Sequence, residues 1–496
     1  MKAHDSRMAK GKLLSLVISL LPAALLLLPV MTVRAGAVFT LLHSFSGTDG
    51  AMPLAGLVLA RDGNLYGTTI RGGTNGVGTV FQAGINGGFA SQYAFAGADG
   101  AYPLAELMQG TDGYLHGTTT YGGANTNQDI LGDGTVFVMS TNGVLTTVSS
   151  CSDEDANPWA GLIQSADGKI LGATLYGGGF DDGTLVSSDG TNDNFGPVLS
   201  FSGSFAGGIY GQRPTSTLVQ DGSFYGTSEG DWLADGDAGT FGGAGTVFSF
   251  NPDTLEGPQG SVLYFFGSVT DASGNILDGF GPNGLVVGSD GKLYGTTSGG
   301  GTNGAGTIFQ LTTNGVLARL YSFTGTNDGN DPDAALVQGA QGTLFGTTYG
   351  GGSAGNGTVF AINPDGTGFK ILHNFSAGGL DATGIHTNSD GANPVGALIL
   401  AGSTLYGTTS AGGGSGDGTV FRLALSGPAL TLTLAGTNAV LSWSTNDCGF
   451  ALEFTTSLAP PVRWSSSATP LVIVGGQNRV TNALTGGQRF FRLDGD

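Results

Sequence analysis

The sequence predicts an all-β protein: a seven-bladed β-propeller closed by its N-terminal strand and followed by a small β-sandwich. Three observations lead to this prediction. A five-residue strand motif recurs seven times, four short strand candidates accompany most copies, and glycine is abundant, at 93 of 496 residues. Charged residues make up only 11% of the chain. Short strands and tight turns, rather than long surface helices, are therefore expected.

The recurring motif is a short apolar strand that ends in glycine and two small residues, which are most often threonines. Its central glycines, from Gly67 to Gly407, recur at intervals of 50 to 69 residues. A period near 50 with strand-like content is typical of propellers, and a parallel β-helix, with its shorter coil, ranks second. The copies define repeats 1 to 7: LYGTT (65–69), LHGTT (115–119), ILGAT (170–174), FYGTS (224–228), LYGTT (293–297), LFGTT (344–348) and LYGTT (405–409).

Each repeat holds four strand candidates that are separated by turn signals. In repeat 1 they are GLVLA (56–60), LYGTT (65–69), GTVFQA (78–83) and FASQYAF (89–95). Asp-Gly pairs often separate the first two strands, and Asn-Gly pairs often separate the last two. Such pairs favour two-residue hairpin turns, which need positive φ angles. Four hairpin-connected strands, repeated radially, make a propeller blade.

The number of fourth strands matches the number of repeats only if the first one along the chain belongs to the last repeat. VFTLLHSF (38–45) resembles a fourth strand but precedes every other strand, and the last repeat ends at GTVFRL (418–423) without one. We therefore expect residues 38–45 to form the outer strand of the last blade. This pairing would remove an open sheet edge and join the two ends of the ring.

Residues 1–35 have the composition of a signal peptide. A basic stretch is followed by the apolar run 13–30, and small residues allow cleavage after Ala35. An uncleaved membrane anchor is the alternative, but Pro22 and Pro29 favour cleavage. The mature chain would keep 12 basic and 36 acidic residues, a net charge of −24, which repels nucleic acid and anionic lipid. We expect a monomer that is secreted or lies at the cell surface.

The pattern DGxLYGTTxxGGxxGxGTVF resembles the tandem repeat of the bacterial choice-of-anchor GloVer-repeat proteins. The resemblance covers residues 38–425 and is most specific in repeats 1, 5, 6 and 7. It implies an exported, propeller-like repeat protein and carries no biochemical activity with it. The expected domains are the signal peptide (1–35), the propeller (36–425) and a tail (428–496) whose alternating strands resemble a fibronectin-III-like sandwich. Trp443 and Trp464 are expected in the core of that tail.

The sequence contains no catalytic fingerprint in a suitable context, such as GxSxG, HExxH or a P-loop. Cys151 and Cys448 form no disulfide framework, and whether they pair stays open. The leading hypothesis is therefore a non-enzymatic binding or cell-surface interaction protein, with glycans or cell-envelope components as partners. The competing hypothesis is an extracellular polysaccharide-acting enzyme that uses loop carboxylates of the irregular repeats 3 and 4.

Candidate site residues lie where the repeat is disturbed or rich in acids. The ligand-binding candidates are Glu229, Asp231, Trp232, Asp235, Asp181 and Asp182. Calcium is the one cofactor considered, with Asp328, Asp331 and Asp333 as its ligands; turn-capping hydrogen bonds are the alternative role of these residues. A recurring DGxxP also supplies one aspartate to most repeats. We interpret these aspartates as hydrogen-bonding backbone amides at blade junctions, against the alternative of an acidic ring that binds a cation.

Overall fold

The computed structural model describes residues 37–494 apart from the following ranges: 125–131, 153, 189–194, 203–208, 231–242, 253–258, 340–341, 382–383, 426–429, 436–437, 445–450, 458–462, 464, 468, 476 and 484–488. The chain divides into two compact units, of which one is Ala37–Ala424 and the other includes Leu425–Asp496. The regular elements of the described residues are β-strands, so the all-β prediction is confirmed. None of the described residues forms a helix capable of crossing a membrane. The expected signal peptide lies outside the described residues.

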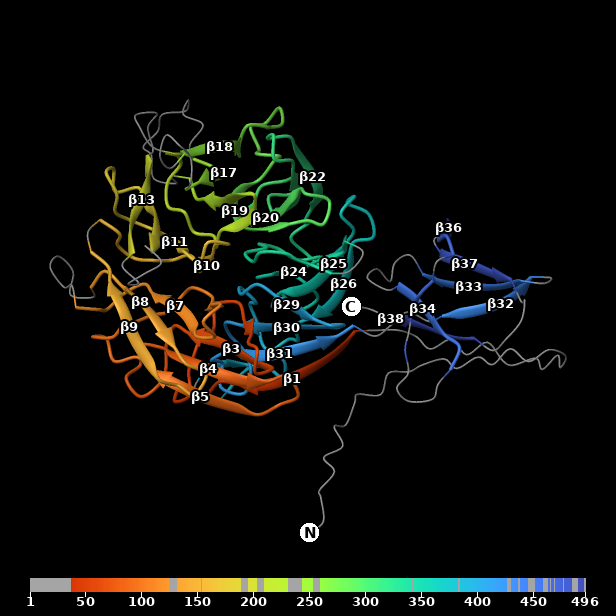
Figure 1. The fold of residues 1–496 in the computed structure, drawn as a ribbon, viewed down its shortest axis with the longest axis horizontal. Helices are drawn as coiled ribbons and strands as arrows, with labels where there is room; N and C mark the ends of the chain where they lie inside the picture. The colour runs from red at the N-terminus through yellow and green to blue at the C-terminus, as the bar shows by residue number, and fades with distance from the viewer. Residues whose placement is uncertain are drawn as a thin grey trace, which may run out of the picture. The chain divides into compact units, whose positions relative to one another are not determined.

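Seven sheets follow the seven repeats, and Figure 1 shows them grouped around a common centre. The architecture is therefore propeller-like. The strands of repeats 1 to 3 are β2 (Val58–Leu59), β3 (Asn64–Thr69), β4 (Thr79–Gly84) and β5 (Phe89–Ala94); β6 (Met108–Gln109), β7 (Leu115–Thr119), β8 (Thr135–Met139) and β9 (Leu145–Ser150); and β10 (Ile163–Gln164), β11 (Ile170–Thr174), β12 (Thr184–Ser188), β13 (Phe195–Ser202) and β14 (Ile209–Tyr210).

Repeats 4 to 7 continue the pattern, with a short hairpin inserted after repeat 6. Their strands are β15 (Val219–Asp221), β16 (Ser223–Ser228), β17 (Thr246–Asn251) and β18 (Gln259–Phe265); β19 (Phe280–Val287), β20 (Leu293–Gly299), β21 (Thr307–Leu311) and β22 (Leu317–Ser322); β23 (Val337–Gln338), β24 (Leu344–Thr348), β25 (Thr358–Ile362) and β26 (Lys370–Asn374); and β29 (Ile399–Ala401), β30 (Thr404–Thr409) and β31 (Thr419–Ala424). The inserted hairpin is β27 (Gly379–Leu380) and β28 (His386–Thr387).

The N-terminal strand β1 (Val38–Ser44) completes the sheet of repeat 7. It pairs antiparallel with β31, from Val38 opposite Ala424 to Ser44 opposite Thr419, and is the outermost strand of that sheet. Figure 1 shows this strand beside β31, which is the last strand of the Ala37–Ala424 unit in the sequence. A register shift interrupts the β1–β31 pairing, and the fourth strands β5, β9, β22 and β26 carry an equivalent shift. The strand predicted to replace the missing fourth strand therefore does so with the same geometry.

The glycine of the repeated motif makes room for a phenylalanine on the third strand. A Cβ atom added to Gly67 would lie 2.6 Å from Phe81 Cζ and 2.9 Å from Leu57 Cδ2. Repeats 2, 4, 5, 6 and 7 show the same close approach of glycine and phenylalanine. Repeat 3 differs, because Val186 occupies the phenylalanine position and its Cγ2 would lie 3.7 Å from a Cβ on Gly172. The smaller side chain leaves a pocket that Val186 lines with Cys151 and Phe195.

The two residues after this glycine link strands within and between repeats. In repeats 1, 5 and 7 the first threonine reaches the next repeat, as Thr296 Oγ1 donates to the carbonyl of Ala334 at 3.0 Å. The second bonds within its own sheet, as Thr69 Oγ1 lies 2.7 Å from Thr79 Oγ1. These side chains are buried, and the hydroxyl groups of Thr118, Thr227 and Thr347 have no hydrogen-bond partner, which is costly. The feature common to the repeats is therefore the packing of the motif glycine, together with the bond made by the second residue.

We expect Gly67→Ala to be more destabilising than Gly172→Ala. The new methyl group at residue 67 must displace a buried phenylalanine ring, and such overpacking costs about 1–3 kcal/mol. At residue 172 only the flexible end of Leu162 is close, at 2.7 Å. Urea unfolding of the two variants measures the difference in the free energy of unfolding. Equal losses of stability would contradict this account of the motif.

The C-terminal unit contains two antiparallel sheets that share one apolar core. The first is formed by β32 (Thr431–Ala435), β33 (Asn438–Ser444), β37 (Gln477–Ala483) and β36 (Val472–Val474), and the second by β35 (Ser465–Ser466), β34 (Ala451–Thr455) and β38 (Phe490–Asp494). Trp443 is buried in the core between Leu441 and Phe491, as expected. Trp464 and Cys448 lie outside the described residues, so the possible pairing of Cys448 with the buried Cys151 stays open.

Candidate functional site

Each repeat has an X-Pro step before its first strand or at its beginning, and the residue before this proline has a left-handed backbone. We call it the display residue, and its φ angle lies between 53° and 62° in all seven repeats. A positive φ is uncommon for residues other than glycine and costs roughly 1–3 kcal/mol. The backbone is thus constant, while six different residue types occupy the position in the seven repeats. The display residues are Met52, Tyr102, Asn157, Arg213, Gly281, Asp331 and Asn393.

Arg213, the display residue of repeat 4, connects two of the sequence-predicted ligand candidates. Its backbone N–H donates to the carbonyl of Asp182 at 2.8 Å, and its carbonyl accepts from the N–H of Glu229 at 3.1 Å. Its guanidinium lies over the ring of Tyr176, 5.7 Å from the ring centroid. The structure therefore brings Asp182 and Glu229 together around an arginine that the sequence analysis did not single out.

Glu229 directly follows β16 and lies within the disturbed motif FYGTSEGDW (224–232). Surrounding protein raises the pKa of its carboxyl group, and the positive charge of Arg213 opposes that rise. The other predicted candidates contribute differently. Asp181 accepts a hydrogen bond from the N–H of Gly177 at 3.0 Å and so stabilises its own loop. Asp231, Trp232 and Asp235 lie outside the described residues.

Two aspartates in repeat 6 form a hydrogen-bonded pair. Asp331 is the display residue and Asp333 follows two residues later; both are half-buried, and their carboxyl groups hydrogen-bond each other. Burial and the neighbouring charge of Asp331 raise the pKa of Asp333 to about 8, and the charge of Glu229 adds to this effect. Repeat 5, which lies between these residues in the sequence, has Gly281 as its display residue. Carboxylates predicted as separate ligand and metal candidates thus form one electrostatic group.

Exposed aromatic rings occupy related positions. Trp159 stands two residues after the display residue Asn157, as Asp333 stands two residues after Asp331, and 37% of its surface is exposed. Tyr349 is 40% exposed, and its N–H donates to the carbonyl of Asp331 at 2.8 Å. The sequence analysis missed these rings and Arg213. The recurring X-Pro step was the signal that could have located Arg213 and Trp159, whereas Tyr349 directly follows the LFGTT motif.

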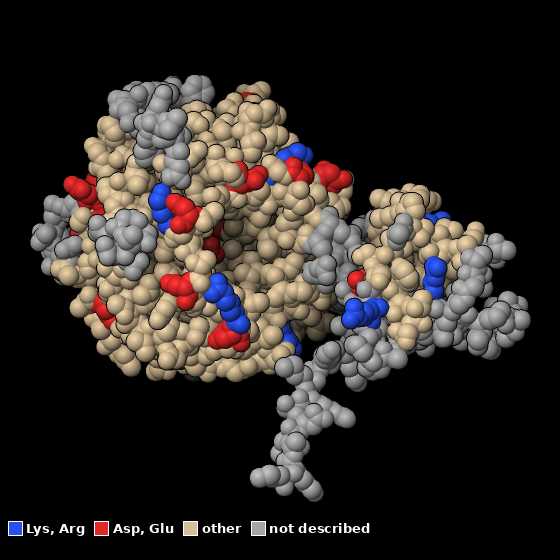
Figure 2. Space-filling model, viewed as in Figure 1, with Lys and Arg blue, Asp and Glu red and all other residues tan. Residues whose placement is uncertain are grey.

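Glu106 breaks the symmetry of the segments that lead into the first strands. Repeats 1 and 3 have glycine at the equivalent position, and the Glu106 side chain occupies the space beside both glycines. A Cβ on Gly56 would lie 2.9 Å from Glu106 Oε2, and one on Gly161 would lie 2.9 Å from Glu106 Cγ. Burial raises the pKa of Glu106, which a hydrogen bond with Thr217 partly offsets. In Figure 1 first strands such as β10 and β29 lie toward the centre of the ring, and Figure 2 shows that this centre is hollowed. The segment that leads into the first strand of repeat 2 thus adds Glu106 to the acidic residues of the repeats.

The three aspartates predicted as calcium ligands do not form one ligand set. The carboxylate of Asp328 accepts hydrogen bonds from Tyr321 Oη at 3.0 Å and from the N–H of Thr324. Asp331 and Asp333 bond each other instead. Within the described part of the chain, no three His, Cys, Asp or Glu side chains are grouped so that they could hold a metal ion. Calcium needs six to eight oxygen ligands, so the structure gives the calcium prediction no support at these residues.

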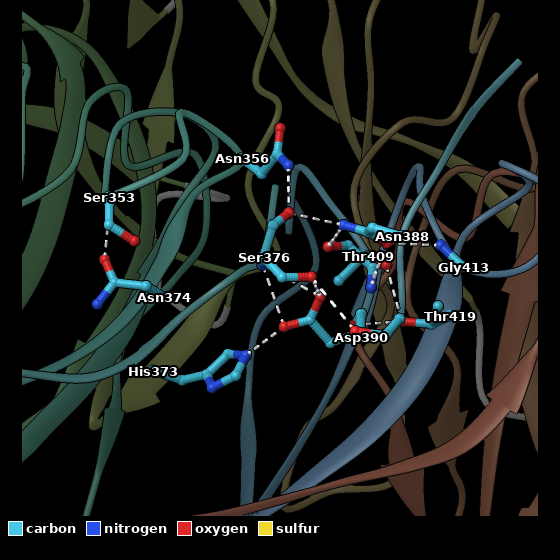
Figure 3. A network of polar contacts seen from close by, with 12 residues as sticks. Ser353, Asn356, His373, Asn374, Ser376, Asn388, Asp390, Thr409, Gly413 and Thr419 are labelled. Atoms are coloured by element: carbon cyan, nitrogen blue, oxygen red, sulfur yellow. Dashed lines mark hydrogen bonds and ion pairs between the residues drawn. The ribbon is translucent and has the colours of Figure 1, made fainter. Parts of the chain in front are cut away.

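The recurring DGxxP aspartates cap loops, as interpreted from the sequence. Figure 3 shows Asp390 accepting hydrogen bonds from Ser376 and His373; the Ser376 N–H lies 3.1 Å away and His373 Nε2 lies 2.9 Å away. Asp49 and Asp99 bind the backbone N–H groups of Ser46 and Ala96 in the same way. A hydrolytic triad needs histidine next to serine, whereas here the aspartate lies between them. The Ser376–Asp390–His373 group is therefore structural.

Three solved structures to which this chain is similar are a fungal alcohol oxidase in complex with copper, the PQQ-bound aldose sugar dehydrogenase of Streptomyces coelicolor and the periplasmic gluconolactonase of Pseudomonas aeruginosa. Their identities to this chain are 13%, 12% and 16%, and their TM-scores are 0.47, 0.38 and 0.40. The alignments cover 91%, 79% and 73% of this chain and 93%, 99% and 99% of those chains. Similarity at this level carries no inference about chemistry.

No curated protein sequence matches the chain. The sequence profile of the Gloeobacter/Verrucomicrobia repeat matches residues 30–236 and 221–438. These two matches span all seven copies of the motif and most of the chain. The pattern of glycine, threonine and phenylalanine that builds each sheet is thus the pattern of a known repeat. The chain belongs to the Gloeobacter/Verrucomicrobia repeat family.

Proposed function

We propose that this chain is an exported, non-enzymatic binding protein of the cell surface or extracellular space, built on a seven-bladed propeller that β1 closes. Its ligand-binding surface, called here the display surface, consists of Trp159, Tyr176, Arg213, Glu229 and Asp333. One observation carries the proposal: the backbone before the X-Pro proline is the same in all seven repeats, while the residue there varies among six types and in repeat 4 is Arg213, which contacts Tyr176 and Glu229. The signal-peptide composition of residues 1–35 and membership of the repeat family support export.

The chemistry of the display surface favours glycans as ligands. Trp159 and Tyr176 are each 37% exposed, whereas the aromatic rings of the repeated motifs are buried in the cores of the sheets. An exposed ring offers an apolar face on which a sugar ring can stack. The carboxylates and the guanidinium offer acceptors and donors for hydroxyl groups. Such a mixture of ring faces and convergent polar groups fits a polyhydroxylated ligand.

We expect Trp159→Ala and Arg213→Gly to weaken glycan binding at least tenfold, a loss of about 1.4 kcal/mol. Glycine is already the display residue of repeat 5, so Arg213→Gly should remove the side chain without disturbing the backbone. Equilibrium binding to a panel of soluble glycans and cell-envelope fractions provides the measurement. Tyr114→Ala is the matched control, because Tyr114 is exposed but precedes β7, at the opposite end of the motif strand. Equal weakening by the control variant would count against the display surface.

An extracellular polysaccharide-acting enzyme is the second candidate. It is favoured by the proximity of Glu229 to the hydrogen-bonded pair Asp331 and Asp333, because a carboxyl group that stays protonated near neutral pH can act as a general acid. Release of reducing ends from polysaccharides tests it. Turnover that is lost in Glu229→Gln but kept in Asp181→Ala would favour the enzyme and overturn the binding proposal. Binding without any hydrolysis product would exclude it for the glycans tested.

A further inference from the structure

Two histidines lie at the junctions between the sheet that β1 completes and its neighbouring sheets. His43 lies on β1 itself, and His373 lies on β26 of repeat 6. In the fourth strands of repeats 1, 4 and 5, the equivalent residues are Tyr93, Tyr264 and Tyr321. Histidine replaces tyrosine at this position only in β26 of repeat 6, as His373, and in β1 itself, as His43. His373 lies at the junction between repeats 6 and 7, and His43 lies at the junction between repeats 7 and 1. Histidine therefore replaces tyrosine at the two junctions that involve β1.

Each histidine combines an aspartate contact with a ring stack across a junction. His373 Nε2 lies 2.9 Å from Asp390 Oδ2, and its ring stacks on Phe39 of β1 with centroids 4.2 Å apart. His43 Nε2 lies 2.9 Å from Asp49 Oδ2, and its ring stacks on Phe89 with centroids 3.5 Å apart. The β1 strand thus contacts repeat 6 through Phe39 and repeat 1 through His43.

The same device without a histidine joins repeats 5 and 6. Tyr321 Oη donates to Asp328 at 3.0 Å, and its ring stacks on Phe369 with centroids 4.0 Å apart and planes 6° from parallel. The geometry matches that of the histidine junctions, but tyrosine does not change charge in mildly acidic solution. Tyr321 is therefore an internal control for the effect of histidine.

Other charged groups near the two junctions are few among the described residues. Asp417 lies beside Asp49, and burial together with the charge of Asp49 raises its pKa. On the neighbouring strands, Lys370 lies on β26, and Arg422 of β31 donates to Asn86 Oδ1 at 3.0 Å. The direct partner of each histidine is thus its aspartate.

We propose that β1 is an acid-sensitive clasp, which holds the ring closed at neutral pH and loosens in acid when the stacked ring of His43 takes up a proton. The proposal rests on the pairing of β1 with β31 and does not depend on the ligand of the protein. In the closed state each histidine can donate from Nε2 to its carboxylate and stack on a phenylalanine. A proton added to the half-buried ring of His43 brings a charge into its contact with Phe89.

The pH range of the test follows from the shift at His43, and the shift at Asp390 acts only in stronger acid. Burial lowers the pKa of His43 below 6.5 despite the opposing effect of Asp49. The detached strand therefore takes up a proton first, and stability is lost as the pH falls below about 6.5. Burial acts to raise the pKa of Asp390, but hydrogen bonds from His373 and Ser376 hold it below its ordinary value. That contribution is also lost in acid, as the pH falls through the pKa of the folded state.

Hydrogen exchange of the full-length chain between pH 7.5 and 5 tests the clasp. After correction for intrinsic exchange, we expect the protection of β1 and β31 to fall at least severalfold more than that of β22, which carries Tyr321. The double variant His43→Tyr/His373→Tyr, which copies repeats 1, 4 and 5, should lose this difference. Should the tyrosines fail to pack, His43→Gln/His373→Gln keeps a donor that does not titrate. A parallel change in β1 and β22 of the wild-type chain, or an unchanged difference in the variants, would overturn the proposal.

Discussion

Deletion of residues 38–45 should destabilise the Ala37–Ala424 unit by more than about 5 kcal/mol, enough to unfold many domains. The deletion removes the ladder to β31 and exposes an inner strand as an edge. It also removes Phe45, which is fully buried against Phe81 with ring centroids 5.1 Å apart. Loss of one buried phenylalanine side chain alone costs about 3–5 kcal/mol.

Thermal and urea unfolding of the deletion variant provide the measurement. The control is a chain that ends at Leu425, because that truncation removes the separate C-terminal unit and leaves β1 in place. We expect the control to retain the unfolding transition of the Ala37–Ala424 unit. If the deletion variant melts at the same temperature as the control, β1 does not close the ring.

Asp333→Asn should stabilise the protein at neutral pH, by roughly 1–3 kcal/mol. In the folded state the pKa of Asp333 is raised, because burial and the charges of Asp331 and Glu229 disfavour its ionised form. In the unfolded chain the same carboxyl group ionises near pH 4. The folded state therefore loses stability as the pH rises from about 4 toward 8, and the asparagine variant should escape that loss.

The matched control for this prediction is Asp328→Asn, five residues earlier in the same repeat. Asp328 accepts hydrogen bonds from Tyr321 and Thr324, so its replacement should destabilise the protein. Urea unfolding at pH 4, 6 and 8 measures both variants. A gain for Asp333→Asn that grows with pH, next to a loss for Asp328→Asn, is the expected result. A loss of stability in both variants would mean that Asp333 is structural and would remove it from the display surface.

The predicted strands were largely confirmed because their signals are local. Alternating apolar residues, Asp-Gly and Asn-Gly turns and the LYGTT motif act over a few residues, and the same chemistry returns in every repeat. The position of β1 could also be predicted, because counting third and fourth strands along the chain left one strand without a partner. The loop-capping role of the DGxxP aspartates followed from turn chemistry in the same way.

The grouping of Arg213, Glu229 and Asp333 required the tertiary structure. These residues belong to repeats 4 and 6 and lie up to 120 positions apart in the sequence, and their separation in space depends on how successive sheets pack around the centre. The contacts of Asp328, Asp331 and Asp333 also depend on the tertiary structure, since Asp328 bonds Tyr321 whereas Asp331 and Asp333 bond each other. By itself the sequence determined the all-β class, the seven repeats and the strand that completes the last sheet, because these depend on short-range patterns. Only the tertiary structure decided which side chains meet, because contacts between repeats are long-range and leave no pattern in any one of them.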